Sequence, residues 1–396
     1  MPRTAANYLL TRSTLAVAIG IASLGIAYQA SAFTAFENET NKFTISGRFA
    51  YSYDWNYQGT SKDTGLNNGG TRINLAYEHY FDNGWTGFAR WEEGFDALFT
   101  TGENDDHFNR YTYVGVSNPT YGTLTIGRQD SLMYDYVDVF TDIPWNFTDY
   151  TAQSWMASDL KGGTRPSRSI KYSVDLGKFT VGAMYGTSYG HIKSGDPVYN
   201  VNNTDANGNL IATPGQDYGY KRKYFYEVGG QYRPGYDVTL GAVFHHAKFK
   251  AGDGETAING NKSPSSNGWE MGANWTPGNW MVAALAGESR NHADFTGHTW
   301  RNYDTFLSYT WPKLLGPAGD LQGYAEYSYA EDRKEKENTI ERSILGLASI
   351  SFDGHVIVAL EHMWMDDTGH RSAENGGGKY DLYDHDATTL FVRYNY

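Results

Sequence analysis

The chain has 396 residues, a formal net charge of −13 and no cysteine. A disulfide framework is therefore excluded, and the acidic balance argues against nucleic acid or an anionic membrane surface as a general partner. Aromatic residues are abundant, with 32 Tyr, 19 Phe and 11 Trp, although the chain is polar on average. That combination is typical of a transmembrane β-barrel, which has aromatic girdles and a polar lumen.

The first 32 residues have the pattern of a secretory signal peptide. Arg3 and Arg12 form a basic start, Leu15–Ile26 is apolar, and Ala30–Ala32 gives an A-x-A cleavage site. The apolar run is shorter than the roughly 20 residues that a membrane anchor needs. We therefore expect a signal peptide over 1–32 and a single domain over 33–396. Removal of the two arginines makes the mature chain two units more negative than −13.

Strand periodicity dominates the remainder. In Lys42–Tyr57 the odd positions are mostly aromatic or apolar and the even positions are mostly polar, as in a half-buried strand. Soluble strands are seldom this long. Fifteen further strands are predicted near 70–81, 84–96, 108–117, 121–128, 165–176, 178–189, 223–233, 236–249, 268–276, 279–290, 301–312, 319–332, 339–352, 355–367 and 385–396.

The links between these strands alternate in length. Tight turns are predicted at Asp82-Asn83, Asn118–Thr120, Gly177, Pro234-Gly235, Pro277-Gly278, Lys313–Ala318 and Asp353-Gly354. The other links are long and polar, such as Gly190–Arg222, Ala251–Asn267 and Thr368–Asp384. Sorted loops and an even strand number favour an all-β fold, a closed antiparallel 16-stranded transmembrane β-barrel. A barrel of this size is wide enough to enclose an aqueous channel.

One predicted loop is exceptional. After the strand that ends at Arg128, no regular period returns until about Arg165, and the segment is rich in Tyr, Phe, Trp and Asp. Irregular loops longer than about 15 residues are usually functional or disordered. The aromatic content argues against disorder, so we expect this loop to pack against something.

Over its mature length the chain resembles the general diffusion porins of Gram-negative outer membranes. The segments that carry the resemblance are "FTISGRF", "GGTRINLAYEHYFDNGWTGFARWE", "NRYTYVGVSNPTYGTLTIGRQ", "TRPSRSIKYSV" and the closing "TLFVRYNY". The resemblance implies short periplasmic turns, long extracellular loops and an inward-folded third loop, here Asp130–Thr164. It also implies passage of small hydrophilic solutes and ions, contact with outer-membrane lipids, a homotrimer and no cofactor.

In this family the third loop narrows the channel, and acidic residues on the loop face basic residues on the opposite wall. The resemblance assigns the basic positions to Arg48, Arg72, Arg110 and Arg165, and the facing acid to Asp142. Neighbouring acids on the loop are Asp135, Asp138 and Asp149. The family often has Pro-Glu-Phe-Gly-Gly near the loop tip, whereas this chain has Pro144–Phe147 with Trp145. That tryptophan either stacks on a sugar ring or packs the loop onto the wall.

Side-chain alternation tests this assignment independently. If the apolar side chains of each strand face lipid, the four arginines and Lys171 face the lumen. The outward side chains that fix this parity are Phe49, Tyr51, Tyr53, Ile73, Leu75, Tyr77, Tyr111, Tyr113, Ile170 and Tyr172. A charge on the lipid face at mid-depth costs about 2–4 kcal/mol. Arg128 has outward parity, and the resemblance implies a trimer contact between it and an acid from Glu103–Asp106.

Other functions have weaker support in the sequence. Gly186–Gly190 matches G-x-S-x-G around Ser188, but a nucleophile elbow requires a helix after the turn and none is predicted. No H-E-x-x-H motif occurs, and the calcium-loop fragment at Asp205 lacks the sixth-position glycine. We expect no enzymatic activity, metal or cofactor. The alternatives are a porin that prefers oligosaccharides and, more remotely, a barrel enzyme or adhesin.

Overall fold

The structure, a computed structural model, describes residues 32–55, 64–95, 98, 107–147, 164–193, 217–251, 263–290, 299–316, 319–334, 339–351, 353–371, 378–383 and 386–396. Apart from Ala32, the predicted signal peptide lies outside these residues.

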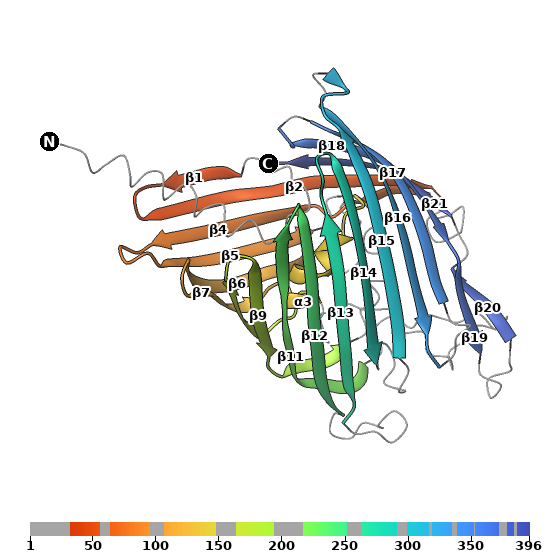
Figure 1. The fold of residues 1–396 in the computed structure, drawn as a ribbon, viewed down its shortest axis with the longest axis horizontal. Coiled ribbons are helices and arrows are strands. Elements are labelled where there is room, and N and C mark those ends of the chain that lie inside the picture. Colours follow the sequence, from red (N-terminus) through yellow and green to blue (C-terminus); the bar gives the residue numbers. More distant parts are fainter. Residues whose placement is uncertain are drawn as a thin grey trace.

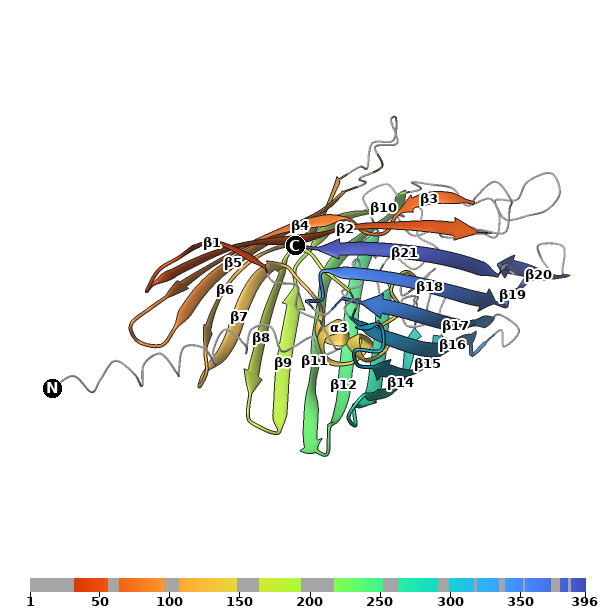
Figure 2. The ribbon, with the colours of Figure 1, turned by 90° about the horizontal axis from the view of Figure 1, so that it is seen from above.

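The described strands form one antiparallel sheet that closes on itself as a barrel (Figures 1 and 2). The strands are β1 (Phe33–Glu37), β2 (Asn41–Trp55), β3 (Gly65–Asn68), β4 (Arg72–Tyr80), β5 (Thr86–Phe95), β6 (His107–Asn118), β7 (Gly122–Arg128), β8 (Ser169–Asp175), β9 (Phe179–Gly186), β10 (Tyr189–Lys193), β11 (Asp217–Gly235), β12 (Val238–Ala251), β13 (Ser265–Trp275), β14 (Trp280–Arg290), β15 (Thr299–Trp311), β16 (Asp320–Asp332), β17 (Thr339–Ile350), β18 (Val356–Met365), β19 (Asp367–Arg371), β20 (Gly378–Tyr383) and β21 (Ala387–Asn395).

The 21 segments correspond to 16 wall strands. Four wall strands are each interrupted once, as β3/β4, β9/β10, β18/β19 and β20/β21, and β1 is an additional short strand. The predicted closed 16-stranded antiparallel barrel is therefore confirmed.

The barrel closes between its first and last wall strands. One edge of β2 pairs with β3 and β4, and the other edge pairs with β21 from Arg48↔Asn395 to Trp55↔Thr388. The short strand β1 pairs with β2 near Phe43 and so lies beside its first half. Every barrel strand then has a hydrogen-bonded neighbour on each side, as a lipid-facing sheet requires.

Alternation along the strands separates an outer apolar face from an inner face. In β2, Phe49 and Tyr53 are 44% and 40% exposed, whereas Ser52 and Asp54 are 2% and 3% exposed. The same alternation continues through β18, where Leu360 is exposed and Glu361 is buried. The outward aromatic and aliphatic side chains therefore form the surface that contacts lipid. Among the described residues, no helix is both long and apolar enough to cross a membrane.

Several boundaries differ from the sequence prediction. The turn expected at Pro234-Gly235 lies at Tyr236-Asp237, where both residues have a φ of 59° and fit the type I′ geometry of two-residue hairpins. The strand expected from Arg165 begins at Ser169. The link expected over Thr368–Asp384 is largely a hairpin, in which β19 pairs with β20.

The long loop after β7 is the feature that interrupts the all-β architecture. It contains a short helix, α3 (Leu132–Tyr136), and a 3-10 turn, η3 (Asp138–Phe140), that sequence periodicity did not predict. Ser131 caps α3 by accepting a hydrogen bond from the backbone N–H of Tyr134 at 3.0 Å. A helix of five residues is too short to show an amphipathic period, which explains why it was missed.

Candidate pore constriction

The third loop folds against the inner wall, as predicted. Its helix α3 contacts β9, β11 and β12, and η3 contacts β13 and β14. Figure 2 shows α3 within the ring of strands. Lumen-facing glycines admit this packing, because a Cβ at Gly241 would overlap the carbonyl oxygen of Tyr136. The predicted loop extends over Asp130–Thr164, of which 148–163 lies outside the described residues.

Wall carboxylates hold the loop by its backbone. At the start of α3, the N–H of Leu132 donates to Oε2 of Glu227 at 2.7 Å. Nearby, Lys171 Nζ ion-pairs with Asp135 Oδ2 at 2.7 Å, which confirms the inward parity of Lys171. Burial raises the pKa of Asp135, while the Lys171 ammonium acts in the opposite direction.

Glu361 on β18 accepts most of the hydrogen bonds from the loop tip. Its carboxylate accepts backbone N–H groups from Trp145 at 2.5 Å, Asn146 at 3.0 Å and Phe147 at 3.1 Å. It also accepts the hydroxyl of Tyr324 at 2.5 Å. Four donors satisfy a carboxylate that is fully buried, so the tip is fixed against this part of the wall.

On the wall formed by β4–β6, three arginines converge on one acid. Glu92 Oε1 accepts from Arg72 Nη1 at 3.3 Å and from Arg110 Nε at 2.7 Å, and Oε2 accepts from Arg90 Nη2 at 2.7 Å. Glu92 is only 4% exposed. A buried carboxylate shared in this way fixes all three guanidinium groups. Moving any one guanidinium away from Glu92 would leave a charge unpaired.

Tyr111 adds an aromatic surface to this cluster. Arg90 lies over its ring with Cζ 4.3 Å from the centroid, and Arg110 and Arg165 lie at 5.9 Å. Its hydroxyl donates to Asp130 Oδ1 at 2.9 Å. Arg165 therefore joins the arginine cluster from the segment before β8 rather than from the strand itself.

The inward positions of Tyr111 and Tyr113 correct the sequence prediction that both side chains face lipid. The outward residues of β6 are Thr112, Val114 and Val116, with Val114 57% exposed. Arg110 nevertheless reaches Glu92, because β6 has an extra residue where Glu92 pairs with Tyr111 and Glu93 pairs with Asn109. This bulge breaks the alternation, so the inward side chain of Arg110 was inferred correctly from an incorrect parity.

The barrel seam contributes further arginines. Arg48 on β2 faces inward as expected and donates from Nε to the carbonyl oxygen of Gly70 at 2.8 Å. Arg393 on β21 lies over Trp145, with Cζ 4.4 Å from the ring centroid. Trp145 also packs against a buried cluster that includes Phe140. Arg90, Glu92 and Arg393 were not singled out from the sequence, although all three occupy inward positions.

The loop acids have different environments. Asp142 is half-buried and accepts the hydroxyl of Tyr134 at 2.5 Å. Asp138 is buried beside Glu270 on β13, and burial followed by that neighbouring carboxylate raises its pKa well above the usual value. Asp149 lies outside the described residues.

In the described part of the chain the remaining sequence motifs do not assemble a second site, and the fragment at Asp205 lies outside the described residues. Gly186–Gly190 crosses from β9 to β10, so the G-x-S-x-G match continues along a strand and is not followed by a helix. Arg128 at the end of β7 donates to Ser167 Oγ at 2.9 Å, and the acids Glu103–Asp106 lie outside the described ranges. No group of metal-ligating side chains occurs in the part of the chain that the structure describes.

A closed barrel with an apolar exterior, a charged lumen and an inward loop defines a channel protein of the bacterial outer membrane. The family model described as Gram-negative porin matches residues 14–396, and the chain belongs to this family. It is therefore an outer-membrane porin that forms a water-filled channel for passive diffusion of ions and small hydrophilic solutes.

Several individual porins are similar to this chain, all at low sequence identity. Outer membrane porin F of Xenorhabdus nematophila is 24% identical over 281 residues, which cover 71% of this chain and 70% of that protein. The structure of Salmonella typhi OmpF in complex with daunomycin has a TM-score of 0.64 at 14% identity, covering 91% of this chain and 99% of the other. The trimer form of OmpT from Vibrio cholerae has a TM-score of 0.61 at 14% identity, with coverage of 90% and 100%.

Proposed function

We propose that the inward arginines and the third loop form the narrowest part of the channel and give it a weak preference for anions. The observation that carries this proposal is the excess of positive charge on one side of the lumen. Three arginines of this group, Arg72, Arg90 and Arg110, share the single carboxylate of Glu92. The arginines of the group are Arg48, Arg72, Arg90, Arg110, Arg165 and Arg393. On the loop, Asp142 provides the opposing charge.

The preference should be moderate. Two unit charges about 10 Å apart interact by roughly 0.4 kcal/mol in water and about 1.7 kcal/mol at an effective dielectric of 20. Physiological salt screens interactions beyond about 8 Å. Such energies bias ion passage without excluding either sign. The negative net charge of the whole chain acts in the opposite direction at the channel mouths, most strongly at low salt.

Reversal potentials in planar bilayers test this proposal. We expect replacement of Arg72 and Arg110 by Ser to shift the reversal potential toward cations, and Asp142→Asn to shift it toward anions. The shifts should persist at high salt, where the mouths are screened and close contacts are not. Reversal potentials that stay fixed in both variants across a salt series would show that these side chains do not line the narrowest point.

A preference for oligosaccharides has less support. Trp145, the residue that suggested sugar stacking, lies beneath Arg393 and packs against the buried cluster around Phe140. Both contacts support the alternative interpretation, in which this tryptophan packs the loop onto the wall.

We further propose that the signal peptide over 1–32 is removed and that the mature barrel assembles as a homotrimer. The wall at β7 and β8 supports an interface between subunits, since each strand has seven residues. Seven residues extend about 23 Å. With a strand tilt of roughly 35–45°, their height along the membrane normal is less than the apolar band of about 25 Å. This low part of the wall is therefore better covered by a neighbouring subunit than by lipid.

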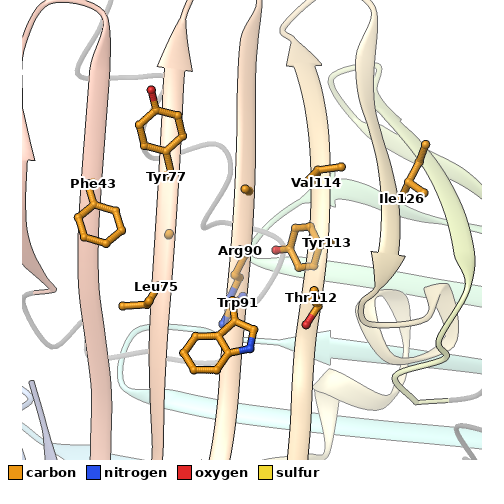
Figure 3. A pocket seen from close by; sticks show the side chains of 11 residues that line it. Phe43, Leu75, Tyr77, Arg90, Trp91, Thr112, Tyr113, Val114 and Ile126 are labelled. Carbon is orange, nitrogen blue, oxygen red and sulfur yellow. The ribbon is translucent and has the colours of Figure 1, made fainter.

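An apolar groove on the outside of β2 and β4–β7 supports a subunit interface on the same face of the barrel. It has a volume of about 440 Å³, and Leu75, Tyr77, Trp91 and Val114 are among the side chains that line it (Figure 3). Ala89 also lines the groove and pairs in register with Tyr77 and Val114. Arg128, with outward parity, pairs in register with Thr112 at the edge of this groove. A charge on the lipid face costs free energy, so an outward arginine is more compatible with a protein neighbour than with lipid.

A further inference from the structure

Three arginines form a row across the seam of the barrel. Arg48 on β2 is directly opposite Arg72 on β4, and Arg393 on β21 is opposite Ala50, two residues along β2 on the same face. Directly opposite side chains have Cβ atoms about 5 Å apart, and diagonal neighbours are about 7–8 Å apart. Like charges at these positions repel each other, so the row requires negative charge from another source.

The protein supplies this negative charge at one end only. Arg72 reaches Glu92 at 3.3 Å, and the same carboxylate is also shared by Arg90 and Arg110. Among the described residues, neither Arg48 nor Arg393 forms an ion pair with a carboxylate. The hydrogen bond from Arg48 goes to the neutral carbonyl of Gly70.

Both guanidinium groups are nevertheless held in position. The hydrogen bond to Gly70 uses Nε of Arg48. Trp145 stacks against Arg393, and the backbone N–H of Trp145 is in turn fixed by Glu361 at 2.5 Å. Two half-buried arginines on adjacent strands, each fixed by neutral groups, retain unpaired N–H donors for a ligand. The planar fork of arginine matches the two oxygens of a carboxylate or phosphate.

We propose that Arg48 and Arg393 form a binding station for oxyanions, that is, for solutes that carry a carboxylate or phosphate group. This proposal deepens and rests on the anion preference proposed above. A passing oxyanion bridges the two guanidinium groups and supplies the missing negative charge, whereas chloride cannot form the paired hydrogen bonds. Trp145 is a positioning residue that keeps the Arg393 guanidinium at the station.

Single-channel titrations with inorganic phosphate test the station. In potassium chloride, added phosphate should reduce the chloride current of the wild-type channel along a saturable curve. We expect Arg48→Gln and Arg393→Gln each to raise the half-saturating concentration about tenfold, the factor that corresponds to 1.4 kcal/mol of binding. Arg393→Lys should give an intermediate shift, because it keeps the charge and loses the fork. Acetate in place of phosphate tests whether a carboxylate alone suffices.

The matched control is Arg233→Gln, which removes one positive charge from an arginine already paired with Asp175 at 2.7 Å. Its phosphate titration should equal that of the wild type.

Unchanged titrations in both Arg48→Gln and Arg393→Gln, or a linear effect in the wild type, would overturn the station. A wild type that conducts with anion preference but lacks saturable block refutes only the station. A wild type without anion preference refutes the proposed constriction itself. If the glutamine variants do not fold, the phosphate titrations of Arg48→Lys and Arg393→Lys decide whether the station exists.

Discussion

Glu361 shows how one side chain can define the free area of a channel. It is fully buried and accepts three consecutive backbone N–H groups of the loop tip, in addition to the Tyr324 hydroxyl. Without this carboxylate, those three N–H groups would lose their acceptor. An unsatisfied buried donor costs about 1–3 kcal/mol.

We therefore expect Glu361→Ala to release the loop tip from β18 and to increase open-channel current noise in planar bilayers. The loss of several bonds favours tip positions away from the wall, so the mean conductance should also change. Glu341→Ala is the control, because the Glu341 side chain lies on the outer face, away from the loop, and accepts the Tyr327 hydroxyl at 2.8 Å. Equal noise in the two variants would show that Glu361 does not hold the tip.

Asp138 is a second residue whose chemistry follows from the folded loop. Burial, followed by the neighbouring Glu270, Asp142 and Glu227, raises its pKa well above the ordinary value. A carboxyl group whose pKa is raised on folding contributes stability that is complete below its unfolded pKa of about 3.9. That contribution is lost as pH rises through the folded pKa.

Asp138→Asn should therefore stabilise the barrel relative to the wild type increasingly as pH rises. The measurement is the unfolding midpoint, followed by heat-dependent gel mobility between pH 5 and pH 9. Asp353→Asn is the comparison, because hydrogen bonds from Ser351 and His355 lower the pKa of this exposed turn residue. Its difference from the wild type should stay constant over that range. A constant difference for Asp138→Asn as well would contradict the raised pKa.

At the scale of elements, the helix in the third loop depends on small residues of the wall. A Cβ at Gly241 would overlap the Tyr136 carbonyl oxygen, and a Cβ at Gly182 would approach the Tyr136 hydroxyl and Leu132. These glycines belong to β12 and β9, so two strands of the wall leave space for α3. Backbone atoms provide the closest contact at Gly241, and they cannot rotate away as a side chain can.

Gly241→Val should consequently displace α3 from the wall. We expect a changed single-channel conductance and a lower unfolding temperature, since overpacking costs about 1–3 kcal/mol. Ala242→Val on the same strand points outward and serves as the control, with conductance near that of the wild type. A Gly241→Val channel identical to the control would mean that the loop tolerates the added volume without moving.

Elements also show where inference from the sequence succeeds and where it ends. Alternation placed Arg48, Arg72 and Lys171 inside because their strands are regular. It misplaced Tyr111 and Tyr113, because a bulge is set by pairing with β5 and leaves no local period in β6. The anchoring role of Glu361 had no local signal at all, since its partners in the loop tip are more than 200 residues away in sequence.

At the scale of the whole molecule, the strand count and closure were predictable from sorted loop lengths and from the demand that no sheet edge meets lipid. The arrangement of the arginines relative to one another was less predictable. Their row depends on the register of β2 against β4 and β21, which joins the two ends of the sheet.

The proposed trimer belongs to this scale, and the groove around Ala89 offers a test. Ala89→Trp fills the groove with an apolar side chain that lipid tolerates and a protein partner does not. We expect the unheated species to shift from trimer to monomer on gels and in mild detergent. Ala273→Trp, outward on β13, is the matched control and should remain trimeric. A trimer that persists with Ala89→Trp would place the subunit interface on another face.

The seam between β2 and β21 also determines when the barrel can form. Asp54 and Thr389 bond directly across 335 residues of chain, so the first wall strand finds its last partner only when the final strand is present. Closing a segment of that length costs about 5 kcal/mol of chain entropy by the (3/2)RT ln n relation. Until closure, the two terminal strands are open edges that recruit other chains. Closure is therefore the late and slow step of folding, and before that step the nascent sheet is most prone to aggregate.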